Sequence, residues 1–144
     1  MNLNFNEIGD EGIAHISNAN FSVLKQLFLF HNNISSNGVK CLCKANFIPT
    51  LIILSLSENP QITDEECKYI RDEKTWNCLT ILNMNRTGLT NKAIEILSKS
   101  VMPNLRKIHL VGNAITKTKN DSEIKSCSNN DQLKIELDKK KKKK

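Results

Sequence analysis

The chain has 144 residues, of which 25% are charged and 39% hydrophobic, which fits one small soluble domain and leaves no room for a second sizeable core. Its formal net charge is +6, but residues 139–144 are six lysines, so residues 1–138 are neutral. The charge balance therefore predicts no specific nucleic-acid face, and the longest apolar run, residues 51–54, is too short for a membrane span.

Two features of the chain concern its compartment. Residues 1–6 lack the positive region and apolar run of a secretory signal, so we expect a cytoplasmic protein, with a nuclear location as the alternative. Five cysteines cannot all pair, and in a reducing compartment we expect buried thiols rather than disulfides. Three of them are predicted to lie in the core: Cys43, Cys67 and Cys127.

Taken in chain order, the sequence alternates between strand-like and helix-like apolar spacing. It opens with half a motif, Leu3-x-x-Asn6-x-Ile8, and helical spacing follows from Asp10. A complete motif then occurs four times. The copies are Leu24-x-x-Leu27-x-Leu29-x-x-Asn32-x-Ile34, Leu51-x-x-Leu54-x-Leu56-x-x-Asn59, Leu79-x-x-Leu82-x-Met84-x-x-Thr87-x-Leu89 and Leu105-x-x-Ile108-x-Leu110-x-x-Asn113-x-Ile115. Ile135-x-Leu137 supplies a last strand.

A helix is predicted after each of the first strands, because an apolar pair recurs there at spacing i and i+3. The pairs are Ile13 and Ile16, Val39 and Leu42, Cys67 and Ile70, and Ile94 and Leu97. We expect helices to start at Asp10, at Ser36 and at Thr63, where Thr63 and Glu66 have the spacing of a capping box. The returning segments carry large side chains that we expect to stack along the core: Phe21, Phe47, Trp76 and Met102.

The second strand leucine recurs every 26 to 28 residues, at positions 3, 29, 56, 84, 110 and 137. This repeat resembles the leucine-rich repeat family, and its period is similar to that of the ribonuclease-inhibitor-like subclass, which includes ribonuclease inhibitor, the Ran GTPase-activating protein and NOD-like receptor repeats. The resemblance implies an α/β fold, a right-handed solenoid (horseshoe) of five to six repeats with a concave parallel sheet and convex helices. Residues 1–138 would form this domain, and residues 139–144 a disordered lysine tail.

The recurring asparagines have a structural interpretation in such a fold. Asn6, Asn32, Asn59 and Asn113 follow strands, where an amide that both donates and accepts can satisfy backbone groups of adjacent turns. Thr87 takes the same position with only a hydroxyl, so we expect it to satisfy fewer groups and its turn to be the weakest of the column.

Aligning the repeats predicts rows of neighbouring residues across the sheet. The first two rows are Gln26, Ile53, Ile81, Lys107, Lys134 and Asn2, Phe28, Ser55, Asn83, His109, Glu136. The third row is Asn4, Phe30, Ser57, Asn85, Val111, Asp138, and the row at the strand exit is Phe5, His31, Glu58, Arg86, Gly112, Lys139.

Positions that the repeat does not fix are the candidates for binding. Side chains alternate along a strand, so Leu27 and Leu29 face the core while Phe28 and Phe30 face the concave solvent side. Large apolar residues have no folding reason to be there, although single exposed apolar side chains are also common on proteins. The predicted partner-binding residues are Phe28, Phe30, Ile53 and Ile81, with a polar rim of Glu58, Arg86, Asn83, Asn85 and His31.

No motif predicts catalysis, because the sequence has no phosphate-binding loop, dinucleotide-binding glycine motif, zinc-protease motif or Cys-x-x-Cys pair. On a helix, Cys41 and Cys43 would point about 200° apart, which does not favour chelation of one metal. The histidines His15, His31 and His109 are interpreted as surface residues. We therefore predict no enzymatic activity, no cofactor and no metal.

The two ends of the chain suggest further contacts. We interpret the lysines at 139–144 as a solvated tail, with weak and salt-sensitive contact to anionic surfaces as the alternative. At the front, Leu3 and Phe5 have no preceding turn to cover them. We expect either a fragment of a longer array or self-association at this edge.

The sequence thus predicts a non-enzymatic protein–protein interaction module that binds a protein partner through its concave face. One alternative, implied only by the resemblance to the Ran GTPase-activating protein, is control of a small GTPase, for which Arg86 is the residue to test. The short array and basic tail depart from that protein's pattern. A second alternative is a tether that binds anionic surfaces through the lysine tail.

Overall fold

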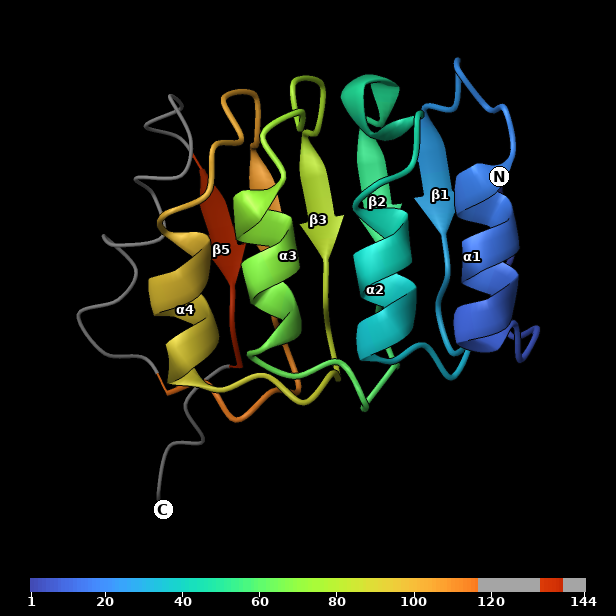
Figure 1. The fold of residues 1–144 in the computed structure, drawn as a ribbon. Coiled ribbons are helices and arrows are strands. Elements are labelled where there is room, and N and C mark those ends of the chain that lie inside the picture. Colours follow the sequence, from blue (N-terminus) through green and yellow to red (C-terminus); the bar gives the residue numbers. More distant parts are fainter. Residues whose placement is uncertain (117–132, 139–144) are drawn as a thin grey trace.

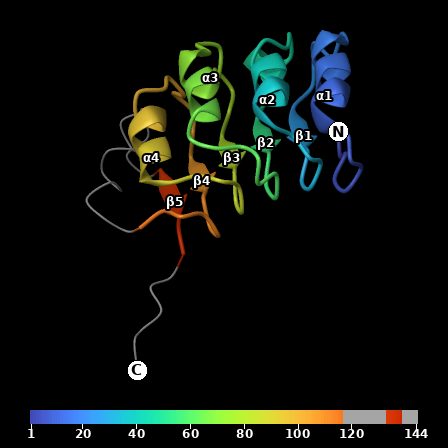
Figure 2. The same ribbon diagram turned by 60° about the horizontal axis from the view of Figure 1, so that its bottom comes forward.

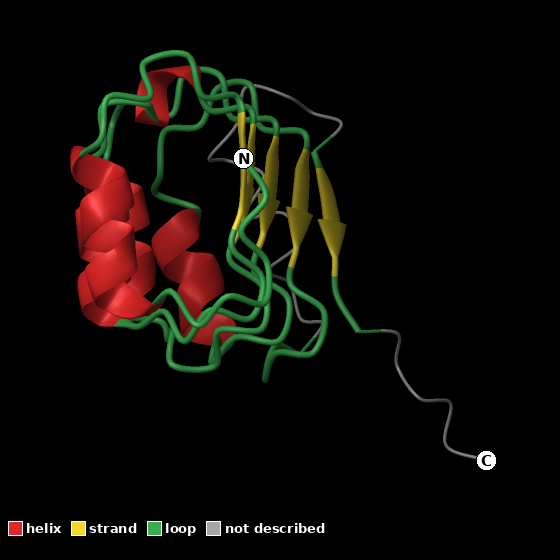
Figure 3. Cartoon of the chain, turned by 90° about the vertical axis from the view of Figure 1, so that its right-hand side faces the viewer, coloured by secondary structure: helices red, strands yellow, loops and turns green. Residues whose placement is uncertain are grey.

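Two layers make up the molecule in the computed structural model, which describes residues 1–116 and 133–138. The helices lie in one layer and the strands in the other (Figures 1 and 3). In chain order the elements are α1 (Gly9–Asn18), β1 (Gln26–Phe28), α2 (Ser36–Leu42), the 3-10 helix η1 (Ile48–Thr50), β2 (Ile53–Ser55), α3 (Glu66–Asp72), β3 (Ile81–Asn83), α4 (Asn91–Leu97), β4 (Lys107–His109) and β5 (Lys134–Glu136). The predictions for Cys127 and for the lysines at 139–144 fall outside the described residues.

The strands form one open sheet in which each strand pairs in parallel with the next along the chain, from β1 to β5. Figure 2 shows the same succession from the side on which the strands end. Leu54 lies between Leu27 and Leu82 in register, and Ile108 and Ile135 continue this column. The rows predicted for the paired strand residues are confirmed, and so is an α/β architecture with a parallel sheet.

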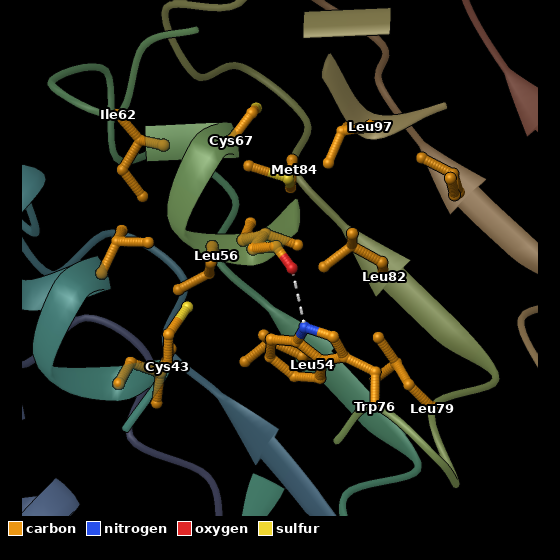
Figure 4. Close-up of a cluster of buried hydrophobic side chains, with 14 of the residues drawn as sticks. Cys43, Leu54, Leu56, Ile62, Cys67, Trp76, Leu79, Leu82, Met84 and Leu97 are labelled. Atoms are coloured by element: carbon orange, nitrogen blue, oxygen red, sulfur yellow. Dashed lines mark hydrogen bonds between the residues drawn. The ribbon is translucent and has the colours of Figure 1, made fainter. Parts of the chain in front are cut away.

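The core lies between the two layers and is built from the recurring apolar positions (Figure 4). Leu54 and Leu82 point into it from the sheet and Leu97 from α4, and all three are fully buried. Because one residue of each repeat contributes to each level of this core, a change of side-chain volume in one repeat is felt by its neighbours.

The returning segments fill the other end of the core with large side chains. Phe47, Trp76 and Met102 are fully buried in the core, and the half-buried Phe21 has its ring 6.5 Å from that of Phe47. The predicted stack is thus confirmed for Phe21 and Phe47. The indole Nε1 of Trp76 donates a hydrogen bond to the Ile70 carbonyl at 3.0 Å (Figure 4). The single polar atom of this side chain is therefore satisfied inside the core.

Asn59 connects two repeats from a fully buried position. Its Oδ1 accepts the main-chain N–H groups of Asn32 and Ile34, each at 3.0 Å. Its Nδ2 donates to three carbonyls, those of Leu29, Leu56 and Ser57. Asn32 and Asn113 also accept two main-chain N–H groups and donate to two carbonyls each. These amides satisfy main-chain groups at the turns, where no regular ladder does so.

Asn6 and Thr87 make fewer contacts at the equivalent positions. Asn6 is exposed, and its Nδ2 donates to the carbonyl of Asn4. The Thr87 hydroxyl lies 3.0 Å from both the Met84 carbonyl and Asn113 Oδ1. Among the described residues it makes no hydrogen bond to the preceding repeat, so the hydroxyl satisfies fewer groups than a buried amide, as expected.

One predicted helix start is wrong and another differs by a single residue. Helix α2 begins at Ser36 as predicted, and α1 begins one residue before Asp10. Helix α3 begins at Glu66 rather than at Thr63, because Thr63 stays extended and bridges to Gly88 of the next repeat. The buried Glu66 carboxylate accepts the Thr63 N–H at 2.6 Å and its hydroxyl at 2.8 Å. Thr63 and Glu66 are therefore hydrogen-bonded as a capping box predicts, but the bonds close the turn that precedes α3.

Aspartates fasten neighbouring repeats together near the helix starts. Asp10 accepts the N–H and the hydroxyl of Ser35, at 2.7 and 2.5 Å. Asp64 accepts the same two groups of Thr90, at 2.8 and 2.6 Å. Each carboxylate thus fixes the residue that precedes the next helix.

The longest repeat step has a local cause. Its additional residue lies in the segment Asn59–Ile62, between β2 and α3, where Pro60 and Gln61 are exposed. Leu54 and Leu82 nevertheless remain in register across this insertion.

Four cysteines lie in the described residues, and all four are free thiols: Cys41, Cys43, Cys67 and Cys78. The predicted burial of Cys43 and Cys67 is confirmed. Burial raises the pKa of the Cys43 thiol to about 12 and also raises the pKa of Cys67, because a thiolate would lose its hydration there.

Candidate protein-binding surface

The sheet turns one face toward the helices and leaves the other uncovered (Figure 3). We call this uncovered side the open face. No helix of the described residues packs on it. The first and third residues of β1 to β4 belong to it, since the middle residue of each strand is buried in the core. They are Gln26, Phe28, Ile53, Ser55, Ile81, Asn83, Lys107 and His109.

The four predicted apolar residues, Phe28, Phe30, Ile53 and Ile81, are all half-buried. Ile53 and Ile81 are neighbours in register on β2 and β3, and Phe28 is paired with Ser55. Parallel strands lie about 4.8 Å apart, so neighbouring side chains on one face shield each other. These residues are therefore less accessible than a surface position in isolation would be, and we refer to them as the apolar patch.

Phe5 is an exposed aromatic beside this patch that the predicted binding set leaves out. Its side chain is 67% exposed, and its ring lies edge-on to that of Phe30, with 4.7 Å between the ring centroids. The ring of His31 is 5.5 Å away. The repeat alignment could have placed Phe5 in the binding set, because Phe5 shares the strand-exit row with His31.

Three charged or titratable residues of the strand-exit row, His31, Glu58 and Arg86, form a connected group. Arg86 Nη1 donates to Glu58 Oε1 at 2.6 Å, and His31 Nδ1 lies 3.7 Å from the other carboxylate oxygen. All three have left-handed backbone, with φ of 53°, 53° and 50°. That conformation favours glycine and disfavours large side chains. The next repeat has Gly112 at this place, with φ of 77°.

Part of the predicted site surrounds a pocket of about 370 Å³ on the open face. Its lining residues are Phe30, Ser57, Glu58, Asn83, Asn85, Arg86 and Val111. The fold thus brings Phe30 together with Glu58, Asn83, Asn85 and Arg86. It leaves the rest of the predicted set outside this pocket. Ile53 and Ile81 lie at the strand starts, while Phe28 and His31 lie on the first repeat, further from Asn83 and Arg86 across the sheet.

Asn83 and Asn85 are partly committed to the fold. Asn83 Oδ1 accepts the Ser57 hydroxyl at 2.6 Å and the Asn85 N–H at 3.2 Å. Asn85 Oδ1 accepts the Val111 N–H at 2.7 Å. These side chains therefore serve the structure through their oxygen atoms, a role that the sequence alignment did not predict.

The C-terminal part of the open face is charged. Glu136 Oε1 lies 2.7 Å from Lys107 Nζ, and its other oxygen lies 2.7 Å from His109 Nδ1. The hydrogen bond from Lys107 lowers the pKa of the Glu136 carboxyl. His15, by contrast, is exposed on α1 in the helix layer, where the sequence placed it.

A second hollow of about 480 Å³ lies beside the first repeat, lined by Met1 and by residues 20–26. Val23 in this segment is 79% exposed. Along the adjacent sheet edge the main chain of Asn4 is already occupied by side chains. Asn2 Oδ1 accepts the Asn4 N–H, and Asn6 Nδ2 donates to its carbonyl.

Residues 1–116 and 133–138 contain no metal-binding cluster and no membrane-spanning helix. No cluster of three or more His, Cys, Asp or Glu side chains could hold a metal ion there. Nor does that part of the chain have a helix of the length and apolar character needed to cross a membrane.

Comparison with known proteins agrees with the architecture. The family described as Leucine Rich repeat matches residues 2–17 and 22–43, which cover the first strand–helix units of the parallel sheet. The chain belongs to the leucine-rich repeat family. Leucine-rich repeat domains in general mediate protein–protein interactions through the extended surfaces of their repeats.

Three relatives share the leucine-rich repeat sequence. Leucine-rich repeat-containing protein 42 of Mus musculus is 30% identical over 109 residues, or 71% of this chain, and the Homo sapiens protein of that name is 29% identical over 116 residues, or 76%. NACHT, LRR and PYD domains-containing protein 4B of Mus musculus is 31% identical over 80 residues, or 54% of this chain. The chain spans about a quarter of the length of the first two, 25% and 26%, and 9% of the third.

Proposed function

We propose that this chain is a non-enzymatic protein–protein interaction module of the ribonuclease-inhibitor-like subclass, with five to six repeats curved so that the open face is concave. In this proposal it works in the cytoplasm or nucleus. Its partner contacts Phe30 and the rest of the apolar patch, together with Glu58, Arg86, Asn83 and His31. Phe5 joins this set because its exposed ring packs against Phe30.

One observation carries the proposal. The open face combines the apolar patch with a pocket of about 370 Å³, and none of the described helices covers it. Exposed apolar surface of this kind, rimmed by polar groups, is typical of partner sites. The left-handed exit residues agree with this, because strained backbone tends to persist where function requires a particular side chain.

The proposal is tested by affinity capture from cell lysate, followed by binding measurements with a purified candidate partner. We expect Phe5→Ala and the double variant Phe28→Ala plus Phe30→Ala to lose that partner. Phe5→Ala should leave thermal unfolding unchanged, whereas the half-buried Phe28 and Phe30 cost about 1–2 kcal/mol of stability when truncated. Val101→Ala, at a 56% exposed apolar residue of the returning segments, is the matched control and should bind normally. Equal binding by all these variants would contradict a partner site on the open face.

The two alternatives have weaker support. Control of a GTPase would use Arg86, whose Nη1 is paired with Glu58 rather than held for a nucleotide. Replacing Arg86 in a GTP hydrolysis assay tests that alternative. The tether hypothesis concerns residues 139–144, and deleting them should abolish any binding to anionic vesicles while leaving partner capture intact.

Self-association at the N-terminal edge remains a further proposal. Met1, Phe5 and Val23 are exposed beside it, and a second copy could cover them. Since Asn2 and Asn6 already occupy the main chain of Asn4, such a contact would depend on side chains more than on strand pairing. Val23→Lys should then shift the protein to the monomer in sedimentation equilibrium. A wild type that is already monomeric at high concentration would contradict the idea.

A further inference from the structure

The hydrogen bonds of Asn83 and Asn85 fix which way their amide groups point. A main-chain N–H can only donate, so the side-chain atom that it contacts must be the amide oxygen. The N–H groups of Asn85 and Val111 therefore hold the oxygens of Asn83 and Asn85, respectively, against the protein. The NH₂ group of each amide makes no hydrogen bond within the described residues, and both side chains line the pocket. The pocket thus has two donors that the fold leaves unused.

The spacing of these donors matches an extended peptide. Asn83 ends β3 and Asn85 begins the turn after it, where main-chain bonds still join Met84 to His109 and Glu58 to Asn85. At the rise of a strand, side chains two residues apart leave the backbone about 7 Å apart. Carbonyl groups on one edge of an extended chain repeat at the same interval, since they too recur every second residue. A strand-like segment lying along β3 could therefore present one carbonyl to each amide.

The other lining groups favour a neutral occupant. Glu58 supplies the pocket with a carboxylate, one oxygen of which is paired with Arg86. Because Glu58 and Arg86 both line the pocket and neutralise each other, an ionic ligand would find no unpaired opposite charge to compensate its lost hydration, whereas a peptide N–H could donate to the Glu58 carboxylate. Phe30 and Val111 provide apolar lining, which suits an aliphatic side chain.

We propose that this pocket binds an extended, uncharged main-chain segment of a partner protein, with carbonyls on the Asn83 and Asn85 amides and an aliphatic side chain between Phe30 and Val111. This inference rests on the proposed function of the open face and specifies which chemistry the partner brings to it. It assigns recognition to side-chain amides rather than to the Arg86–Glu58 ion pair.

Substituting aspartate for asparagine separates the two roles of these side chains. Asn85→Asp keeps an oxygen to accept the Val111 N–H, but it replaces the free donor with a second acceptor. Asn83→Asp does the same at the neighbouring position. The chain also offers a matched control, because Asn4 Oδ1 accepts the Phe30 N–H at 2.9 Å in an equivalent arrangement outside the pocket. Asn4→Asp therefore makes the same chemical change at the same row of the sheet.

The probe is the blocked dipeptide N-acetyl-leucyl-alanine N-methylamide, whose acetyl and alanine carbonyls lie on one edge of the extended chain with the aliphatic leucine between them. Its binding is followed through the side-chain NH₂ signals of Asn83 and Asn85 in ¹⁵N–¹H correlation spectra, assigned by their disappearance in the aspartate variants. We expect saturable shifts of both signals, and weaker binding of N-acetyl-leucyl-alanine, which is anionic but otherwise matched. Loss of one hydrogen bond in Asn85→Asp should weaken binding about tenfold, while Asn4→Asp binds like the wild type.

Three results would overturn the inference. They are the absence of any saturable shift up to the solubility limit, tighter binding of the anionic probe, and equal binding by Asn85→Asp and Asn4→Asp. The spectra of the unliganded variants show whether each one is folded, so loss of binding is not confused with loss of structure.

A failure of this inference can be told apart from a failure of the proposed function. A purified partner that is lost by Phe5→Ala but retained by Asn85→Asp would leave the open face as the binding surface and remove the amides from it. A partner unaffected by every open-face variant would remove the surface itself.

Discussion

The side-chain oxygen of Asn59 accepts the main-chain N–H of Asn32, 27 residues earlier, at 3.0 Å. The same amide donates to three carbonyls, and its residue is fully buried. One side chain therefore satisfies main-chain groups on two consecutive turns.

Replacing this amide should be among the most damaging single changes in the chain. Asn59→Ala leaves several buried polar groups without partners, at about 1–3 kcal/mol each, so we expect a loss of at least about 3 kcal/mol in the free energy of unfolding. Urea denaturation measures it. Asn6→Ala is the control, because Asn6 holds the equivalent position but is exposed, and its replacement should change stability by less than about 0.5 kcal/mol. Similar losses in both variants would contradict this account of the column.

Thr87→Asn should stabilise the protein. The hydroxyl of Thr87 makes no hydrogen bond to the preceding repeat within the described residues, whereas an amide could donate to a carbonyl of that repeat. We expect a gain of about 0.5–1.5 kcal/mol, seen as a higher melting temperature in calorimetry. A lower melting temperature would mean that the insertion at Pro60 and Gln61 has moved the carbonyl out of reach.

His31→Gly should not weaken the fold, although it removes a whole side chain. His31 is exposed with φ of 53°, a backbone that costs a residue with a side chain about 1–2 kcal/mol. Its contact with Glu58, at 3.7 Å on the surface, contributes little. We therefore expect unchanged stability or a gain of up to about 1 kcal/mol in urea denaturation.

The comparison for this variant is Lys40→Gly, at an exposed position within α2. Glycine in a helix interior costs about 1 kcal/mol, so Lys40→Gly should destabilise the protein. Equal losses at both positions would show that the backbone at His31 is not strained. Weaker partner binding by a fully stable His31→Gly would indicate that the side chain is kept for recognition.

The cysteines should report unfolding through their reactivity. With a pKa of about 12, the Cys43 thiol is almost entirely protonated at pH 8, and protonated thiols do not react with iodoacetamide. Cys67 is buried as well, whereas Cys41 and Cys78 are partly exposed. Mass spectrometry of the alkylated native protein should find the partly exposed pair modified first. The buried pair should become labelled only as denaturant unfolds the chain, and early labelling of Cys43 would contradict its burial.

The sheet and its register could be predicted from the sequence because both depend on the leucine period. Leu27, Leu54 and Leu82 must share one column of the core. Side chains alternate along a strand, so the residues on either side of each leucine must then face the open side of the sheet. The start of α3 could not be predicted from its capping residues, because Thr63 bridges to Gly88, a contact that only the packing of two repeats creates.

The candidate site was predicted in outline but not in its hydrogen bonding. Phe30, Glu58 and Arg86 could be placed on one surface from the alignment alone. The hydrogen bond from the Val111 N–H to the side-chain oxygen of Asn85 could not be predicted, because it depends on which main-chain groups the turn leaves unpaired. Phe5 was left out of the binding set because its contact with Phe30 requires the first half-motif to pair with β1.

The insertion at Pro60 and Gln61 has a consequence for how such a surface can change over time. It adds length at the rim, yet Leu54 and Leu82 keep their alignment, so a lengthened loop does not rearrange the residues on the strands. Growth of the chain and substitution of its recognition residues are thus independent events. A descendant of this protein could acquire a new partner by substituting single residues on the open face of the strands. Its loops could lengthen or shorten at the same time without changing which strand residues are neighbours.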